Sequence, residues 1–128
     1  MKIDHIALFC RDLEAMRQFF AEYFGCTACD LYHNPRTGLR TYILTFPDGG
    51  ARLEIMNRPD MAEADPSLPN LGFVHMSVSL GSHEAVDTHT ARLDAHGYRR
   101  LDGPRVTGDG YYESRIAGPE GIQIELTV

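Results

Sequence analysis

The sequence predicts an α+β fold in which one module, a strand followed by a helix and three further strands, occurs twice. This prediction depends on landmarks that return at nearly constant spacing along the 128-residue chain. The landmarks are His5 and His75, Glu54 and Glu125, and Gly25 and Gly97, which lie 70, 71 and 72 residues apart. We therefore expect a first βαβββ module over 1–56, a linker over 57–70 and a second module over 71–128, together forming one structural domain.

The helix of each module is predicted from its caps and its apolar face. Asp12 and Ser82 can each cap a helix start, and Gly25 and Gly97 supply the left-handed residue that commonly ends one. The first helix has an apolar face at spacings of three and four residues, formed by Leu13, Met16, Phe20 and Phe24. The face of the second is weaker: Ala85, Val86 and Leu93, interrupted by His89 and Thr90.

Four side chains with metal-ligand chemistry fall on equivalent strands of the two modules. Strand side chains alternate between faces, and the more apolar face of each sheet is expected to pack on its helix. The opposite, open faces of the first and last strands carry His5, Glu54, His75 and Glu125. Neutral imidazoles and carboxylates suit a divalent first-row metal, and four such ligands leave two octahedral positions for water or substrate. The alternative is that these are hydrogen-bonded histidines and solvated glutamates.

Candidate substrate contacts are taken from the neighbourhood of these four residues. Phe9, Met56 and Ser77 share strand faces with the predicted ligands. Arg105 and Tyr112, together with Tyr111, flank a glycine-containing segment, 104–110, that is predicted to be a flexible loop. A solvated loop charge remains the alternative for Arg105, and strand packing remains the alternative for the tyrosines.

Composition excludes several classes of protein. The net charge is −6, from 12 basic and 18 acidic residues, and no basic stripe for nucleic acid appears. No apolar run approaches the roughly 20 residues of a membrane span, and no signal peptide opens the chain. The three cysteines form an odd number, and the Cys26–Cys29 pair has CxxC spacing without a second pair. We expect a cytoplasmic protein with free thiols.

The sequence resembles the vicinal oxygen chelate superfamily, also called the glyoxalase/bleomycin-resistance/dioxygenase family, over nearly its whole length. The segments that carry the resemblance are Asp4–Leu8, Phe24-Gly25, Leu53-Glu54-Ile55, Phe73–Met76 and Gly118–Glu125. The last is the most specific, since that family closes on a Pro-acid-Gly turn and a strand with a ligand Glu. The resemblance implies two βαβββ modules that form a cupped mixed β-sheet around one divalent metal, with the helices on the outside.

Within that family, ligands in the order His, Glu, His, Glu resemble bacterial glyoxalase I. The resemblance implies metal-ligand roles for His5, Glu54, His75 and Glu125, and a divalent transition metal such as Ni, Zn, Co or Mn. At two positions the sequence differs from that of the glutathione-using enzymes. Phe9 occupies a position where those enzymes have Arg, and Arg58 occupies a position where they have Asn. The contacts expected for glutathione are therefore absent at these two positions, and the sequence leaves open whether glutathione is used.

The resulting functional prediction is a metal-dependent lyase or isomerase. Its substrate would be a small hydroxy-carbonyl or 2-oxoaldehyde-derived compound, converted through a metal-stabilised enediolate. Glu125 or Glu54 would act as the catalytic base, and Glu125 is favoured. Two alternatives stay open, a non-catalytic protein that sequesters an antibiotic-type molecule and an extradiol-type dioxygenase. We expect a homodimer, because half-cups expose sheet edges, with the site built within one chain or across the dimer.

Overall fold

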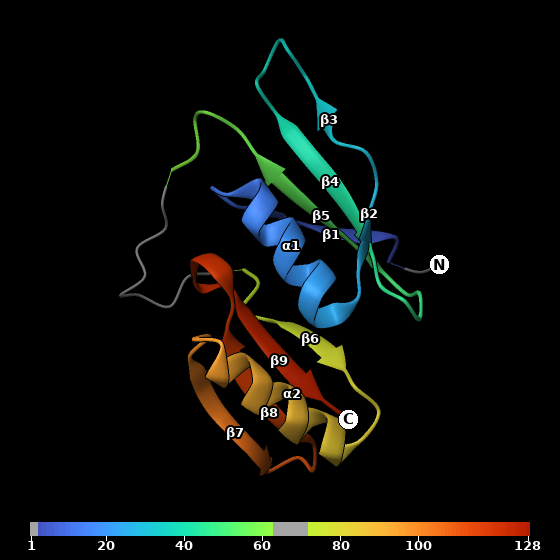
Figure 1. The fold of residues 1–128 in the computed structure, drawn as a ribbon, viewed down its shortest axis with the longest axis vertical. Coiled ribbons are helices and arrows are strands. Elements are labelled where there is room, and N and C mark those ends of the chain that lie inside the picture. The colour runs from blue at the N-terminus through green and yellow to red at the C-terminus, as the bar shows by residue number, and fades with distance from the viewer. Residues whose placement is uncertain (1–2, 63–71) are drawn as a thin grey trace. The chain divides into compact units, whose positions relative to one another are not determined.

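The predicted α+β class and its two repeated modules are confirmed by the computed structural model, which describes residues 3–62 and 72–128 (Figure 1). The chain divides into a first unit, Met1–Glu63, and a second unit, Ala64–Val128. The expected linker, 57–70, starts at the last residue of a strand, and its part from residue 63 onward lies outside the described residues. Neither helix in the described part is long and apolar enough to cross a membrane.

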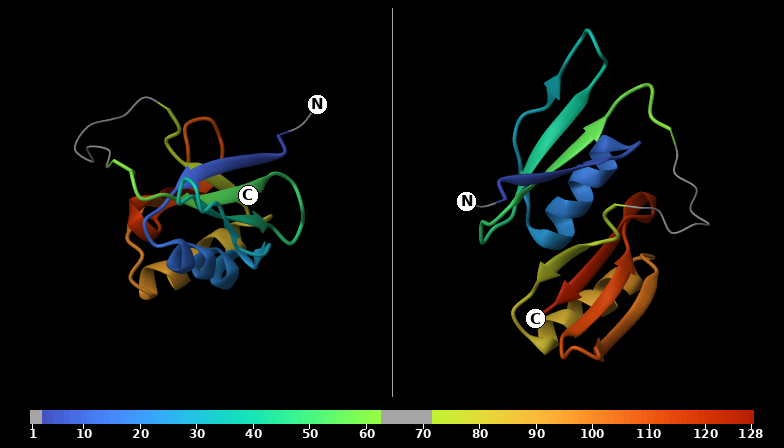
Figure 2. Two further views of the ribbon diagram at one scale, coloured as in Figure 1. Left: turned by 90° about the horizontal axis from the view of Figure 1, so that it is seen from above. Right: turned by 180° about the vertical axis from the view of Figure 1, so that it is seen from behind.

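A mixed sheet forms the first unit, and helix α1 (Leu13–Phe24) packs against one of its faces (Figures 1 and 2). Its strands are β1 (His5–Phe9), β2 (Thr27–Ala28), β3 (Tyr32–His33), β4 (Arg40–Thr45) and β5 (Arg52–Asn57). The order is β1-β5-β4-β2, with β3 also paired to β4, and only β1 and β5 run parallel among these pairs. The module's second strand is thus split into two short pieces, β2 and β3.

Helix α1 begins and ends where its caps predict. The Asp12 side chain accepts a hydrogen bond from the Ala15 backbone N–H at 2.9 Å, and Gly25 ends the helix in the left-handed region, at φ 65°. The predicted face is buried, and two further aromatic residues join it; the buried set is Leu13, Met16, Phe19, Phe20, Tyr23 and Phe24. This helix therefore seals one face of the sheet and leaves the other open.

The second unit repeats the same topology. Its elements are β6 (Met76–Ser79), α2 (His83–Ala95), β7 (Arg100–Val106), β8 (Tyr112–Ala117), a 3₁₀ turn at Pro119–Gly121 and β9 (Gln123–Thr127). The strand order is β6-β9-β8-β7, with β6 parallel to β9. Strands β6, β8 and β9 therefore correspond to β1, β4 and β5, which places His75 and Glu125 at positions equivalent to those of His5 and Glu54.

Thr90 is part of the buried face of α2, although the sequence suggested that this polar residue interrupts the apolar face. It is buried together with Val86 and Leu93, and its hydroxyl donates to the Val86 carbonyl at 2.6 Å. The same hydroxyl lies 2.5 Å from the Ser114 hydroxyl of β8. Because the hydroxyl is fully satisfied, burying Thr90 costs little, and this pair ties α2 to its sheet.

Strand β7 extends to Val106, so the expected loop over 104–110 is shorter than predicted. The pairing of β7 with β8 shifts register between Asp102 and Arg105, which is where Pro104 lies. Proline lacks a backbone N–H and is tolerated in a sheet at such irregularities. The strand therefore continues through the proline instead of ending before it.

Replacing Gly103 with Ala is expected to destabilise the protein strongly. Gly103 has φ +70°, and an added Cβ would clash with the backbone carbonyl oxygen of Glu113. A strained non-glycine conformation alone costs about 1–3 kcal/mol, and the clash adds to it. Urea denaturation should show the loss, whereas Gly108→Ala, with nothing within 4 Å of the added Cβ, should lie close to wild type. Equal stability of the two variants would contradict this account.

Candidate metal centre

The first His–Glu pair lies on the open face of the first unit. Leu53 and Ile55 of β5 are buried against the helix side, so Glu54 between them points the other way. His5 starts β1, the parallel neighbour of β5. The His5 Nε2 atom lies 3.6 Å from the Glu54 Oε2 atom. The two predicted ligands of this unit are therefore neighbours on one surface.

Hydrogen bonds orient both members of this pair. His5 Nδ1 lies 2.9 Å from Asp4 Oδ2, and the Thr41 hydroxyl donates to Glu54 Oε1 at 2.8 Å. Asp4 also forms an ion pair with Arg52, and the hydrogen bonds from His5 and Arg52 lower the pKa of the Asp4 carboxyl. His5 Nδ1 thus faces Asp4, and Nε2 is the ring nitrogen directed at Glu54 Oε2. A metal cation between these two atoms would be stabilised by the Nε2 lone pair of a neutral ring and by the carboxylate.

The second unit contains a matching pair. His75 immediately precedes β6 and Glu125 lies in β9, and their Nε2 and Oε2 atoms are 3.4 Å apart. The Ser77 hydroxyl donates to Glu125 Oε1 at 2.7 Å. The glutamate side chains are well shielded in both pairs, with 21% of Glu54 and 16% of Glu125 exposed. In each unit a hydroxyl thus fixes one carboxylate oxygen and leaves the other facing an imidazole.

The donor set fits a divalent transition metal, although each unit supplies only half of it. Separations of 3.4 and 3.6 Å are compatible with two ligands that each lie about 2.0–2.2 Å from one metal. Across residues 3–62 and 72–128, no group of three or more His, Cys, Asp or Glu side chains is assembled to hold a metal ion. Two ligands alone make a weak site, so neither pair by itself would hold a metal firmly.

Three of the predicted substrate contacts lie beside these pairs. Phe9 of β1 is opposite Met56 of β5 in the parallel register, two residues beyond the level of Glu54, and Phe9 is 52% exposed. Together they form an apolar surface next to the first pair. Ser77 is hydrogen-bonded to Glu125 itself, so its hydroxyl orients the carboxylate.

The other two predicted contacts have different partners. Tyr112 lies on the helix side of its sheet, where its hydroxyl donates to Asp87 at 2.6 Å and its ring stacks on His83 at 4.0 Å. Arg105 forms an ion pair with Asp102, which lowers the pKa of that carboxyl. The structure therefore does not bring Tyr112 together with Glu125, and it gives the Arg105 charge a partner within β7.

Two charged residues of the second open face were absent from the sequence prediction. Glu113 and Arg115 alternate with Ser114 and Ile116 along β8, and the latter two are buried on the helix side. Burial, followed by the neighbouring Glu125 carboxylate, raises the pKa of Glu113. The same alternation argument that identified the other faces would have found both residues, had β8 been assigned its full length.

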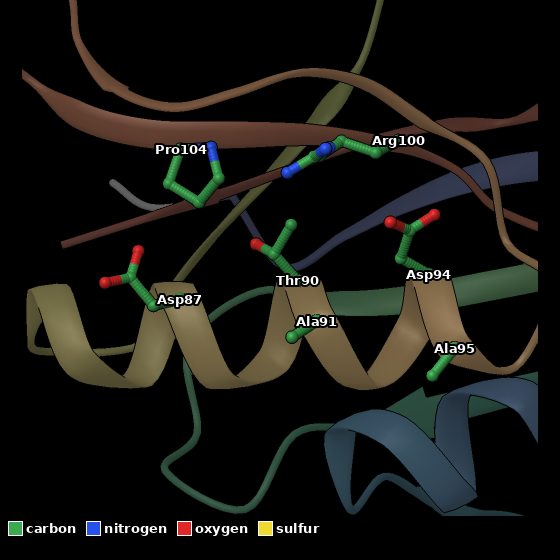
Figure 3. A pocket seen from close by; sticks show the side chains of 7 residues that line it. All are labelled: Asp87, Thr90, Ala91, Asp94, Ala95, Arg100 and Pro104. Carbon is green, nitrogen blue, oxygen red and sulfur yellow. The ribbon is translucent and has the colours of Figure 1, made fainter.

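A groove in the second unit lies apart from the open face that carries His75 and Glu125. Figure 3 shows its side chains on α2 and β7: Asp87, Thr90, Ala91, Asp94, Ala95, Arg100 and Pro104. None of the predicted ligands or substrate contacts lines it. We therefore assign the candidate centre to the strand faces and not to this groove.

The CxxC cysteines have contrasting surroundings that predict different reactivity. Cys26 is buried, and burial raises the pKa of its thiol to about 11, whereas Cys29 is exposed, and neither forms a disulfide. Because the thiolate is the nucleophile, iodoacetamide at about pH 8 should modify Cys29 first and leave Cys26 until the protein unfolds. Peptide mass mapping of the alkylated protein, with Cys29→Ser as control, measures this. Faster labelling of Cys26 would contradict the assignment.

Comparison with known proteins gives a consistent picture of the fold. The model of the glyoxalase/bleomycin resistance protein/dioxygenase superfamily matches residues 2–126. The uncharacterized protein YqjT of Bacillus subtilis (strain 168) is 27% identical over 130 residues, covering 95% of this chain and 94% of that protein. A glyoxalase family protein from Enterococcus faecalis matches with a TM-score of 0.81 at 22% identity, over 99% of this chain and 97% of that one. The trypanothione-dependent glyoxalase I of Leishmania major matches with a TM-score of 0.78 at 16% identity, over 99% of this chain and 86% of that one.

Proposed function

This chain belongs to the glyoxalase/bleomycin resistance protein/dioxygenase superfamily, and we propose that it is a metal-dependent lyase or isomerase within it. The substrate class is a small hydroxy-carbonyl or 2-oxoaldehyde-derived compound. The observation that carries the proposal is the matched pair in each unit, in which a histidine Nε2 faces a glutamate Oε2 at 3.6 or 3.4 Å. Neither an imidazole nor a hydroxyl-anchored carboxylate is needed at these positions by the fold, because strand faces tolerate many residue types.

The proposed metal ligands are His5, Glu54, His75 and Glu125. Two imidazoles and two carboxylates suit Ni, Zn, Co or Mn in the divalent state. When bound, such a metal acts as a Lewis acid toward two neighbouring substrate oxygens. The Asp4 carboxylate supports this role, because it holds the His5 ring so that Nε2 is available.

Glu125 is proposed as the base that removes a proton from the substrate carbon next to the carbonyl group. Its Oε1 atom is held by the Ser77 hydroxyl and its Oε2 atom faces His75, so Oε2 would have to leave a bound metal to take the proton. Glu54, anchored in the same way by Thr41, is the alternative base. Phe9 and Met56 provide an apolar wall that limits water beside the first pair.

The substrate is proposed to differ from that of glutathione-dependent enzymes, because two residues that would contact glutathione are replaced. Phe9 has no charge to offer a glutathione carboxylate. Arg58 is engaged by Asp60 in two hydrogen bonds of 2.6 Å each. A hemithioacetal formed from another thiol, or a substrate without a thiol, fits these positions better.

A homodimer is part of the proposal. Strands β1 and β6 each lie at an edge of their sheet, with one side of the strand unpaired. The segment before β6 also carries exposed apolar side chains, Phe73 at 89% and Val74 at 63%. A second copy of the chain would cover such surfaces, and the two His–Glu pairs would meet either within one chain or across the dimer.

The function is tested with the purified chain stripped of metal and then reloaded separately with Ni, Zn, Co or Mn. Turnover is followed for methylglyoxal mixed with each of several thiols and for small hydroxy-carbonyl compounds without a thiol. We expect activity with at least one metal and none in the stripped protein. Activity that is the same in stripped and loaded protein would contradict the proposal. Oxygen consumption with a catechol would favour a dioxygenase, and tight binding of an antibiotic by metal-free protein would favour sequestration.

A further inference from the structure

Arg115 is a cation on the open face of the second unit whose Nε–H has no hydrogen-bond acceptor among the described residues. It lies in β8, directly opposite Glu125 of β9 and Asp102 of β7 in the sheet register. Its Nε atom is buried and makes no hydrogen bond in the part of the chain that the structure describes. A buried charged donor without an acceptor destabilises the folded protein. A ligand that supplies an acceptor would remove this penalty.

The carboxylates on either side of Arg115 are already committed to other donors. Asp102 accepts from Arg105 and from the Gly103 backbone N–H. Glu125 accepts from Ser77 through Oε1 and faces His75 through Oε2. The Nε–H of Arg115 therefore has no acceptor, although Asp102 and Glu125 flank it and its charge acts on Asp102.

The repeated fold shows that this position does not require a charge. Strand β4 corresponds to β8, and Ile43 is the residue opposite Glu54 in the first unit, as Arg115 is opposite Glu125 in the second. An aliphatic side chain therefore satisfies the packing at the equivalent place. The two units therefore differ beside the proposed base, Glu125, where the second unit has a guanidinium and the first unit has an aliphatic side chain.

We propose that Arg115 binds an anionic group of the substrate, a carboxylate or a phosphate, separate from the two oxygens of the reacting centre. A guanidinium offers parallel N–H donors that match both groups in geometry and charge. This inference rests on the proposed function and narrows it. The substrate is then a hydroxy-carbonyl compound or hemithioacetal that carries an acidic tail, and Arg115 determines specificity for that tail.

The first test observes Arg115 directly in the metal-free protein. The Nε–H cross-peak of Arg115 in a ¹H–¹⁵N NMR spectrum is assigned by its loss in Arg115→Lys. Succinate and inorganic phosphate are titrated separately, with chloride at matched ionic strength as the reference. We expect a saturable shift with at least one of the two anions, and comparing them distinguishes a carboxylate from a phosphate site. No saturable shift with either anion would overturn the inference.

The second test measures binding of hydroxamates to the metal-loaded protein. Acetohydroxamate and the monohydroxamate of succinate share a metal-chelating head, and only the latter carries a carboxylate tail. We expect the tailed compound to bind about 10- to 100-fold more tightly, the range for hydrogen bonds to charged groups. This preference should disappear in Arg115→Met. It should persist in the matched control Arg100→Met, which removes the same charge from the groove between α2 and β7 (Figure 3).

The outcomes separate this inference from the proposed function. Equal binding of both hydroxamates by the metal-loaded wild type would overturn the role of Arg115 and leave the metal site intact. A protein that binds no metal, yet shows the saturable shift of Arg115, would contradict the proposed function and support the anion site. A preference lost equally in Arg100→Met and Arg115→Met would overturn the assignment to Arg115.

Discussion

Replacing Glu125 with Gln is expected to reduce turnover by about 10²- to 10⁴-fold, the contribution typical of a positioned base. Glutamine keeps the size of the side chain and an oxygen that can accept from Ser77, so the fold of β9 should be retained. It cannot accept the substrate proton as a carboxylate does. Initial rates at saturating metal, on protein whose metal content has been measured, give the result.

Two further variants complete this experiment. Glu54→Gln alters the equivalent proposed ligand of the first unit, and we expect a smaller loss of turnover from it. Glu84→Gln removes a carboxylate from the exposed first turn of α2 and should be indistinguishable from wild type. Full metal content and full turnover in both Glu54→Gln and Glu125→Gln would show that neither glutamate is the base.

Replacing Phe20 with Ala is expected to destabilise the first unit by about 3–5 kcal/mol, the range for truncating a buried aromatic residue. Phe20 is fully buried, and its ring centroid lies 5.6 Å from that of Phe24 and 6.4 Å from that of Phe46. Its removal leaves a cavity between α1 and the sheet that carries Glu54. Chemical denaturation followed by circular dichroism measures the change.

Tyr32→Ala provides the control for this prediction, because Tyr32 lies in the same unit and is 54% exposed. We expect a change within about 0.5 kcal/mol for this variant, as for most surface substitutions. A Phe20→Ala protein as stable as Tyr32→Ala would show that the packing of α1 does not hold the first unit together.

Periodicity in the sequence was sufficient to predict both helices and the open faces of the sheets. The spacing of Leu13, Met16, Phe20 and Phe24 defined the buried side of α1, and caps at Asp12 and Gly25 fixed its ends. Strand alternation likewise separated Glu54 from Leu53 and Ile55. These features are local, so they depend on few assumptions about the rest of the fold.

Features that depend on exact strand length were harder to predict. Tyr112 was predicted to close over the substrate, and in the structure it shares a strand face with Ser114 and Ile116 and contacts Asp87 and His83 of α2. The sequence left its direction open, because the residues around the glycines were treated as a loop and a loop assigns no face to its side chains. Assigning β8 from Tyr112 onward also places Glu113 and Arg115 on the open face.

The partners of the predicted ligands could not be found from spacing alone. Thr41 reaches Glu54 from β4, whereas Ser77 reaches Glu125 from β6. These two strands do not correspond to one another, although the two His–Glu pairs are otherwise alike. Such cross-strand hydrogen bonds require the sheet register, which turns and bulges determine. The sequence predicts which residue types would act as ligands, and the register shows how each carboxylate is oriented.

Equilibrium titration of metal into the purified, metal-free protein tests the central claim most directly, that His5, Glu54, His75 and Glu125 hold one cation together. The stoichiometry and affinity are compared for wild type, His5→Ala, His75→Ala and the control His96→Ala, which alters the C-terminal cap of α2. We predict one metal per chain, with affinity unchanged in the control and reduced by more than about 100-fold in each of the first two variants, because losing even a hydrogen-bonded partner of a ligand costs about 10- to 100-fold. Metal binding that survives both His5→Ala and His75→Ala, or no binding by wild type, would contradict the account.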